Sequence, residues 1–220
     1  DETAPPGNPD LKRAPEGWRP QSDEALAWSP ELPPRERETE IEFNWAGAEA
    51  RRTGQVLHRL LEHVGRGGVE ALGSDDRAAL IDRIPALLRA IGTGPETLPA
   101  SHGLVREAFE RTLESETGRW ILSGAHREHA CELPLSGVID GRLVNAVIDR
   151  TFIDADGVRW IIDYKSGYHA GGDLEGFLGE EAARYDAQLG LYRRLFEQLG
   201  ETDIRAALYL PRHDRLVETG

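Results

Sequence analysis

Two apolar runs joined by a short polar stretch constrain the fold of this chain most strongly. Residues 143–153 and 158–162 have the length and the β-branched content of strands. The stretch between them ends in Gly157, and a glycine that closes a short loop is typical of a β-hairpin. The sequence therefore predicts two antiparallel strands that are neighbours in a sheet.

The register of this hairpin places two carboxylates together. If the loop is residues 155–157, with glycine in the left-handed position, counting outward sets Asp149 directly opposite Asp163. Facing carboxylates repel and destabilise a sheet unless a positive charge lies between them. A divalent cation would supply that charge, so the pattern favours a metal site. A two-residue loop would shift the register by one residue and weaken this argument.

The second run ends in a polar tripeptide, Asp163-Tyr164-Lys165. Alternation along a strand puts Asp163 and Lys165 on one face and Tyr164 on the other. The chain has 26 basic residues, of which only Lys12 and Lys165 are lysine. A compact ammonium approaches a phosphate or a water as a point charge, which a forked guanidinium does not. These residues alone leave two interpretations open: a surface salt bridge at a strand end, or a metal site beside a charged catalytic group.

Two further acids precede this hairpin. Asp140 and Gly141 have the chemistry of a hairpin turn, so we interpret Asp140 as a turn residue, although its surroundings resemble those of Asp149. Glu132 lies in a strand-like stretch, residues 128–135, and is a better candidate for a supporting acid. A solvated strand residue is an equally open interpretation of Glu132.

These motifs, in this order, resemble the nuclease core of the RecB family of PD-(D/E)XK nucleases. The central part of the resemblance is Glu132, then Asp149 in a Val-Ile-Asp-Arg context, then Ile-Asp-Tyr-Lys-Ser-Gly ending at Gly167. Two further motifs extend it. Upstream, Gly54 and His58 form a Gly-x-x-x-His motif, and downstream, Gln188 and Tyr192 form a Gln-x-x-x-Tyr motif. It spans about residues 50–210 and suggests the C-terminal nuclease domains of bacterial helicase-nucleases of the AddA and RecB type. One departure is Ala146, where the family usually has glycine.

The resemblance implies an α/β fold, with a restriction-endonuclease-like core, a central mixed β-sheet flanked by helices, and a helical insert. It implies a metal-dependent deoxyribonuclease, with exonuclease action expected, in DNA end processing and recombinational repair. The expected partners are DNA with single-stranded ends, an ATP-dependent UvrD/Rep-like helicase domain in the same parent chain, and a second subunit of an AddAB- or RecBCD-like complex. The expected location is the bacterial cytoplasm, at the nucleoid during action and away from any membrane.

The resemblance also assigns roles to individual residues. The expected cofactor is Mg²⁺ or Mn²⁺, and its expected ligands are His58, Asp149, Asp163 and the backbone carbonyl of Tyr164. The expected catalytic residues are Asp149, Asp163, Lys165, Glu132, Gln188 and Tyr192. Without the resemblance, His58 would be interpreted as a packed or solvated histidine beside an apolar helix stripe. Gln188 and Tyr192 would be interpreted as interface packing.

Two parts of the chain differ in composition. Residues 1–40 hold eight of the 13 prolines and have little apolar periodicity, which is typical of an extended linker. Trp18 and Trp28 are candidates for pinning this segment to a neighbour. We predict that residues 41–220 form the nuclease domain. The chain begins at Asp1 and contains no methionine, which fits a piece of a longer protein whose preceding part, by the resemblance, is a helicase.

Apolar periodicity predicts the remaining elements. The predicted helices are residues 46–64, 75–91, 102–116 and 180–199, and the further predicted strands are residues 126–135, 204–210 and 216–217. The second and third helices are interpreted as an insert that covers the sheet or binds a partner. Glycine-rich residues 168–179 are expected to form a loop that either admits a nucleic-acid strand or is disordered.

The net charge of −13 argues against a protein that holds DNA tightly by itself, because phosphate contacts supply most non-specific affinity. A local basic track remains open as an interpretation. Its candidate members are Arg51, Arg52, Arg184, Arg193, Arg194 and Arg212. We therefore expect weak, salt-sensitive DNA binding by this part of the protein, with a helicase delivering the strand.

The single cysteine, Cys131, permits no internal disulfide and no iron–sulfur cluster held by four cysteines of this chain. No apolar run resembles a signal peptide or a membrane span, so a reducing cytoplasm is the default expectation. Two other functions stay open. One is a nuclease fold that has lost catalysis and serves in DNA binding or docking, and the other is an acidic interaction domain whose motifs match by chance.

Overall fold

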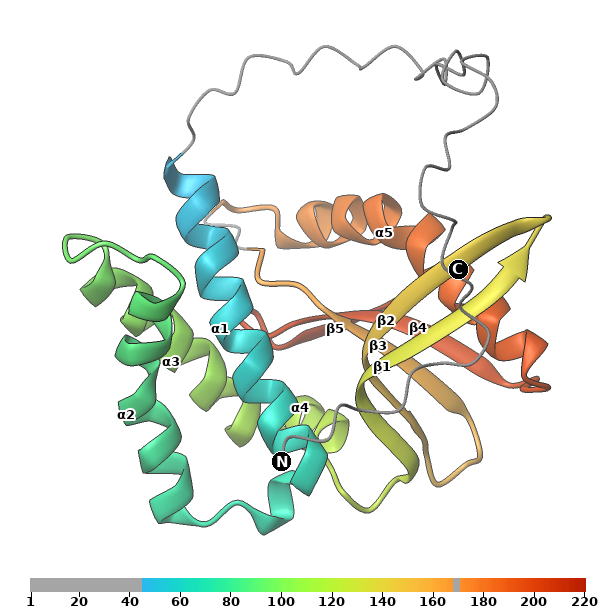
Figure 1. Ribbon diagram of the computed structural model, residues 1–220, viewed down its shortest axis with the longest axis horizontal. Helices are drawn as coiled ribbons and strands as arrows, with labels where there is room; N and C mark the ends of the chain where they lie inside the picture. The colour runs from blue at the N-terminus through green and yellow to red at the C-terminus, as the bar shows by residue number, and fades with distance from the viewer. Residues whose placement is uncertain (1–44, 168–170) are drawn as a thin grey trace, which may run out of the picture. The chain divides into compact units, whose positions relative to one another are not determined.

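The computed structural model describes residues 45–167 and 171–220. Its elements are α1 (Trp45–Gly67), the short 3-10 helix η2 (Val69–Ala71), α2 (Ser74–Ala90), α3 (Leu98–Glu114), α4 (Glu116–Ile121), β1 (Arg127–Ile139), β2 (Arg142–Ile153), β3 (Arg159–Tyr164), α5 (Leu174–Gln198), β4 (Ile204–Leu210) and β5 (Arg215–Thr219) (Figure 1). The proposed linker, residues 1–40 with Trp18 and Trp28, lies outside the described residues.

The strands form one five-stranded sheet in the order β1-β2-β3-β4-β5. All neighbours are antiparallel except β3 and β4, which are parallel. Parallel neighbours need a crossover connection, and α5 lies in that connection. A mixed sheet flanked by helices confirms the predicted α/β fold class.

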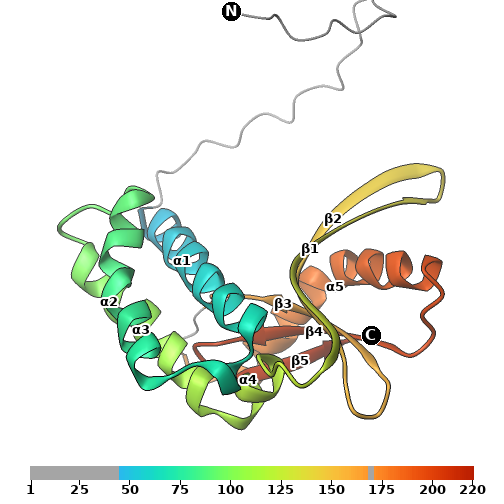
Figure 2. The ribbon, with the colours of Figure 1, turned by 60° about the horizontal axis from the view of Figure 1, so that its bottom comes forward.

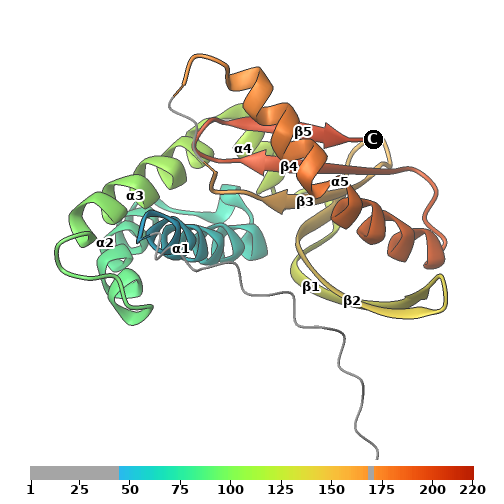
Figure 3. The same cartoon turned by 90° about the horizontal axis from the view of Figure 1, so that it is seen from above.

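Helices cover both faces of the sheet. On one face, α1 to α4 bury side chains such as Leu61 and Phe109 in a core that includes Phe152 of β2. On the other face, α5 buries Leu189 in a second core with Ile161 of β3. Figure 2 shows β3, β4 and β5 between these two groups of helices, and Figure 3 shows α5 lying across the same strands. The predicted helical insert, α2 and α3, therefore packs with α1 in the core on this face of the sheet.

Both predicted turns are confirmed. The β2–β3 turn has Gly157 at φ 88°, and the backbone amide of Asp154 donates to the carbonyl of Val158 at 3.0 Å. Strand pairing then continues to Arg150 opposite Ile162, so the next two residues, Asp149 and Asp163, stand across from each other as predicted. At the β1–β2 turn, Asp140 and Gly141 have φ values of 52° and 75°, which are typical of a type I′ turn.

The glycine-rich loop is shorter than predicted. Residues 168–170 lie outside the described residues, but α5 begins at Leu174 rather than near 180, so Gly176 and Gly179 are helical. The Asp173 side chain accepts a hydrogen bond from the backbone amide of Gly176 at 2.8 Å and starts the helix. Leu178 is buried in the core beneath α5. The cap and this burial offset the low helix propensity of glycine.

Candidate metal centre and active site

The site lies at the point of the β1–β2 hairpin where side chains of the same strand switch from the α1 side of the sheet to the α5 side. Cys131 of β1 is paired with Arg150 of β2, and Leu133 with Ile148. Arg150 points toward α1, donating to the carbonyl of Gly65, whereas Ile148 lies in the core beneath α5. Residues two apart normally share a face, so the hairpin turns over between these pairs.

Glu132 and Asp149 lie at this turnover point. Glu132 falls between the two paired residues of β1, which places it across from Asp149. Its backbone φ is 50°, an uncommon value for a residue other than glycine. Because Asp149 also stands across from Asp163, three adjacent strands carry one acid each in a row. Sequence reasoning placed only the Asp149–Asp163 pair in this row.

Asp149 is held at the end of the β2–β3 ladder. Its Oδ2 accepts a hydrogen bond from the backbone amide of Tyr164 at 2.8 Å. Burial, and after it the charge of Asp163, raises the pKa of Asp149 to about 7. Burial, followed by the charge of Asp149, also raises the pKa of Glu132. These carboxylates therefore repel one another when ionised, as expected of a site that is completed by a cation.

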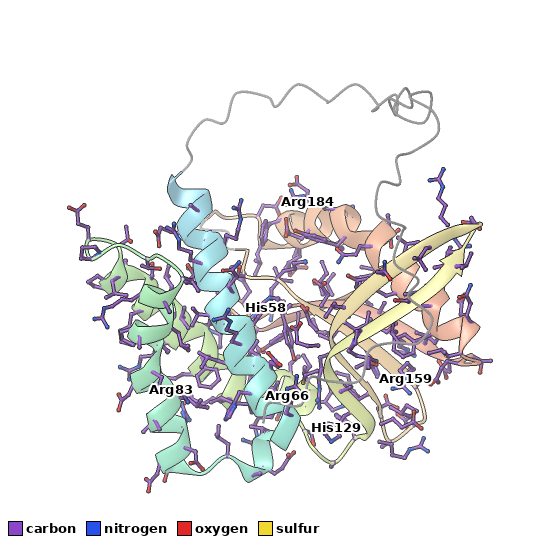
Figure 4. All side chains as sticks on the ribbon, viewed as in Figure 1. His58, Arg66, Arg83, His129, Arg159 and Arg184 are labelled. Atoms are coloured by element: carbon purple, nitrogen blue, oxygen red, sulfur yellow. The ribbon has the colours of Figure 1, made fainter. Side chains whose placement is uncertain are left out.

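His58 reaches this row from α1, on the side of the helix that faces the strands (Figure 4). Its Nε2 donates to the backbone carbonyl of Tyr164 at 2.9 Å, and its Nδ1 lies 3.6 Å from Oδ2 of Asp149. Burial lowers the pKa of His58, which favours a neutral imidazole. With the proton on Nε2, the lone pair of Nδ1 faces a carboxylate oxygen.

Gly54 lets α1 approach the end of β3. A Cβ at this position would lie 2.6 Å from Oγ of Ser166, the residue that follows Lys165. The upstream Gly-x-x-x-His motif therefore has a packing reason for its glycine.

Lys165 and Asp163 form an ion pair beneath α5. Nζ of Lys165 lies 2.7 Å from Oδ2 of Asp163, and it also lies 4.0 Å from the centre of the Tyr185 ring. Burial lowers the pKa of Lys165, but the charge of Asp163, its hydrogen bond and the nearby Tyr185 and Asp149 together outweigh burial, so the pKa is raised and the ammonium stays charged. Alternation places Tyr164 on the opposite face, where it is buried.

Gln188 and Tyr192 of α5 approach the same carboxylates from the other side. Gln188 donates a short hydrogen bond to the Tyr192 hydroxyl. Burial raises the pKa of Tyr192, and the charges of Asp163 and Asp149 contribute to this shift. The structure therefore brings the downstream Gln-x-x-x-Tyr motif into the neighbourhood of the acids.

A buried arginine that sequence reasoning did not single out supports this site. Arg150 follows Asp149 and is fully buried. Its guanidinium donates to the backbone carbonyls of Gly65, Ile121 and Ser123, at 2.8, 3.0 and 2.8 Å. It thus joins the ends of α1 and α4 to the strand position beside Asp149. Only its place in the Val-Ile-Asp-Arg motif signalled it in the sequence.

The donor set fits a divalent cation. Ligand atoms of His58, Glu132 and Asp149 lie within 4.8 Å of one another. Oδ2 of Asp163 is buried and has no aligned hydrogen bond despite its contact with Lys165. Carboxylate oxygens suit Mg²⁺ and Mn²⁺, and imidazole suits Mn²⁺. The carbonyl of Tyr164, a predicted ligand, accepts the hydrogen bond from His58, while Glu132, predicted as a supporting acid, joins the cluster.

The cluster opens onto a pocket of about 510 Å³. Its lining residues are Arg51, Gly54, Gln55, His58, Arg59, Glu62, Glu132, Tyr164, Lys165 and Ser166. One wall is α1 and another is the end of β3, so a ligand in this pocket would contact the imidazole and the ammonium together.

A model of the PD-(D/E)XK nuclease superfamily matches residues 35–219. The chain belongs to this superfamily. Membership agrees with the order of elements around the acids and with the Asp163-Tyr164-Lys165 tripeptide at the end of β3.

Other comparisons add little to this membership. No curated protein matches the chain. Among solved structures, the crystal structure of protein VC1899 from Vibrio cholerae is similar over 76% of this chain and 48% of that chain, with 14% sequence identity and a TM-score of 0.28. The match therefore spans about half the length of that protein. Within the described part of the PD-(D/E)XK chain, no helix has the length and apolarity to cross a membrane.

Proposed function

We propose that this chain is a Mg²⁺- or Mn²⁺-dependent DNA nuclease that hydrolyses phosphodiester bonds. The observation that carries the proposal is the row of Glu132, Asp149 and Asp163 on adjacent strands, with Lys165 beside it on an open pocket. Superfamily membership supports the same reaction class. A site of three acids, an imidazole and one lysine suits an anionic substrate only when a cation is also bound.

The proposed roles follow from the contacts of each side chain. Asp149, Asp163, Glu132 and His58 would hold the cation, which would neutralise charge on the phosphate and lower the pKa of a water molecule. Lys165, kept charged by Asp163, would orient the attacking water or stabilise negative charge in the transition state. The amide of Tyr164 holds Asp149 in place through its hydrogen bond.

The α5 residues would act on the other side of the acids. Gln188 and Tyr192 are hydrogen-bonded to each other, and a phenol whose pKa burial raises remains a neutral donor at neutral pH. We propose that this pair contacts the bases or phosphates of the strand beside the cation. Such contacts would orient the scissile phosphate rather than take part in proton transfer.

The finer parts of the proposal rest on the resemblance of the motifs to the RecB family. They are exonuclease action on single-stranded ends, a role in DNA end processing and recombinational repair, an ATP-dependent helicase in the same parent chain, and a second subunit of an AddAB- or RecBCD-like complex. A bacterial cytoplasmic location follows from the same resemblance. The net charge of −13 supports delivery of DNA by a partner.

Cleavage of labelled DNA tests the proposal. The substrates are end-labelled linear single and double strands and a circular single strand, each with Mg²⁺, Mn²⁺ or EDTA. We expect metal-dependent cleavage of linear strands that Asp163→Ala and Lys165→Ala both abolish. Cleavage of the circle would show that no strand end is needed, against the exonuclease assignment.

A negative result would separate the alternatives. If no strand is cut but calorimetry detects cation binding that Asp163→Ala removes, the metal site stands and strand delivery by a partner is required. If neither cleavage nor cation binding is detected, the nuclease proposal is wrong and a docking module with a nuclease fold takes its place. Cleavage that persists in Asp163→Ala would also contradict the proposed site.

A further inference from the structure

The arginines predicted to form a basic track are mostly engaged elsewhere. Arg52 pairs with Glu49 at 2.5 Å, and Arg184 pairs with Glu181. Arg194 forms two hydrogen bonds with Asp140, both of 2.7 Å, and Arg193 donates to the carbonyls of Thr219 and Gly220. The predicted track is therefore not a continuous surface of free guanidinium groups.

Two arginines of α1 behave differently. Arg51 and Arg59 are both exposed and both line the pocket that contains His58 and Lys165. Across residues 45–167 and 171–220, neither side chain has an ion pair or a hydrogen bond with another residue. Arg59 was not among the predicted members of the track. Whether an arginine has an acidic partner depends on which acids the fold brings near it, and the sequence alone does not show this.

The positions of these arginines define a direction along the pocket. They are eight residues apart in one helix, which is about 12 Å along the axis at 1.5 Å per residue. Arg59 is adjacent to His58 in the sequence, whereas Arg51 lies two turns nearer the start of α1. Toward the end of α1 the same pocket is lined by Glu62 and Glu132. Among the residues that line the pocket, the two arginines therefore lie toward the start of α1 and the acids toward its end.

This arrangement matches a strand of phosphates that runs along α1. A guanidinium group binds phosphate with two parallel hydrogen bonds, and an unpaired one has no protein partner to give up. Along one strand of a duplex, phosphates are about 3.4 Å apart along the helix axis, so 12 Å spans several of them. Acids at the other end of the pocket would repel the strand there.

We propose that Arg51 and Arg59 bind phosphates of the nucleic-acid strand on one side of the scissile bond. This inference rests on the proposed nuclease function and identifies how that site holds its polyanionic substrate. The two residues would hold the strand and would not take part in the chemical step. Their loss should therefore weaken binding and raise KM while kcat changes little.

The test measures binding of a fluorescent single-stranded oligonucleotide as a function of salt. Arg51→Gln, Arg59→Gln and the double variant are compared with Arg83→Gln, which removes the same charge from the exposed face of α2. Figure 4 shows Arg83 away from His58, and no other residue of the described chain forms an ion pair with it. Binding is measured in EDTA and again in Ca²⁺, an oxygen-ligated cation, with gels to check that the strand is intact.

The slope of log K against log salt is the deciding quantity. Each phosphate contact on a single strand contributes about 0.7 to this slope. We expect the slope to fall by about 0.7 in each single variant and about 1.4 in the double variant, and to be unchanged in Arg83→Gln. Arg51→Lys should retain the wild-type slope, since it keeps the charge. Equal slopes for Arg51→Gln, Arg59→Gln and Arg83→Gln would overturn the proposal.

The outcome is separable from that of the cleavage test. If the wild-type protein cuts DNA but the slopes do not change, only the phosphate contacts are wrong. If the slopes fall as expected but neither metal-dependent cleavage nor cation binding is found, the contacts stand and the nuclease proposal fails. Melting temperatures of the exposed variants should match that of the wild-type protein, which excludes unfolding as the cause.

Discussion

Asp140 and Asp149 each follow a Val-Ile dipeptide, yet they occupy opposite environments on the same hairpin. Asp140 is in the β1–β2 turn, exposed, where two hydrogen bonds from Arg194 lower the pKa of its carboxyl. Asp149 is largely buried within β2, and burial together with Asp163 raises its pKa to about 7. The carboxylate of Asp140 has a counter-ion, Arg194, within the chain, whereas the carboxylate of Asp149 lies beside further acids.

This difference shows that the residues packed near a carboxylate, rather than its local sequence, determine what it does. The carboxylate of Asp140 forms its ion pair with an arginine of α5, Arg194. The row at Asp149 holds three acids, and Lys165 forms an ion pair with one of them, Asp163. We propose that a cation completes the row at Asp149 and that none is bound at Asp140, and the following predictions test that contrast.

The largest effect is expected on cleavage. Asp149→Asn should reduce the initial rate of metal-dependent DNA cleavage by roughly 10³-fold or more, because it removes a carboxylate from the proposed cation site. Asp140→Asn is the matched control and should leave the rate unchanged. Comparable losses in the two variants would break the contrast.

A smaller effect is expected on stability in the presence of metal. A ligand that binds only the folded state at about 100 times its Kd stabilises it by about 2.7 kcal/mol. Saturating Mn²⁺ should therefore raise the Tm of the wild-type protein and of Asp140→Asn by the same amount, relative to EDTA. The increase should largely disappear in Asp149→Asn. Thermal scans in Mn²⁺ and in EDTA measure it.

The pH dependence of stability without metal should also distinguish the two acids. The pKa of Asp149 rises from 3.8 to about 7 on folding, so between these values the folded state keeps a proton that the unfolded state has lost. The contribution of Asp149 therefore destabilises the fold as pH rises from about 4 to 7, by at most about 1.4 kcal/mol per pH unit. Above that range it is constant.

Urea unfolding in EDTA across this pH range measures the effect. Asp149→Asn should remove part of the decline, and the variant should be more stable than the wild-type protein near neutral pH. Asp140 has the opposite sign, because its pKa is lowered on folding. It contributes stability that is present above pH 3.8 and lost as the pH falls below its folded-state pKa. An unchanged decline in Asp149→Asn would contradict the assigned burial.

The smallest effect is expected at the hairpin tip. Both Asp140 and Arg194 are exposed, and ion pairs at the surface contribute little because water screens them. Asp140→Asn, Arg194→Gln and the double variant should each lower the Tm by no more than about 4 °C. A double-mutant cycle from thermal melts provides the coupling, and a large coupling would mean that the tip anchors α5.

Turn chemistry accounts for much of what the sequence predicted correctly. Gly157 set the β2–β3 register, and with it the opposition of Asp149 and Asp163. The same reasoning was not applied to the other turn. Counting back from Asp140 and Gly141 places Glu132 across from Asp149, so the full row of three acids was predictable. Which of these residues bind a cation stays a prediction.

Other features depend on contacts that local sequence does not reveal. The turnover of the hairpin at Glu132 arises from packing against α1 on one side and α5 on the other. The early start of α5 depends on the Asp173 cap, which competes with the low helix propensity of Gly176. The pairing of Arg194 with Asp140 joins residues far apart in the chain. Long-range contacts of this kind decided which arginines remain free.

The central claim is that a single row of acids on β1, β2 and β3 binds the cation. The most direct test is a crystal of the protein soaked in Mn²⁺ and measured for anomalous scattering. The account predicts a strong peak in contact with the carboxylate of Asp149 and beside those of Asp163 and Glu132. A peak at Asp140, or no peak near Asp149 at saturating Mn²⁺, would contradict it.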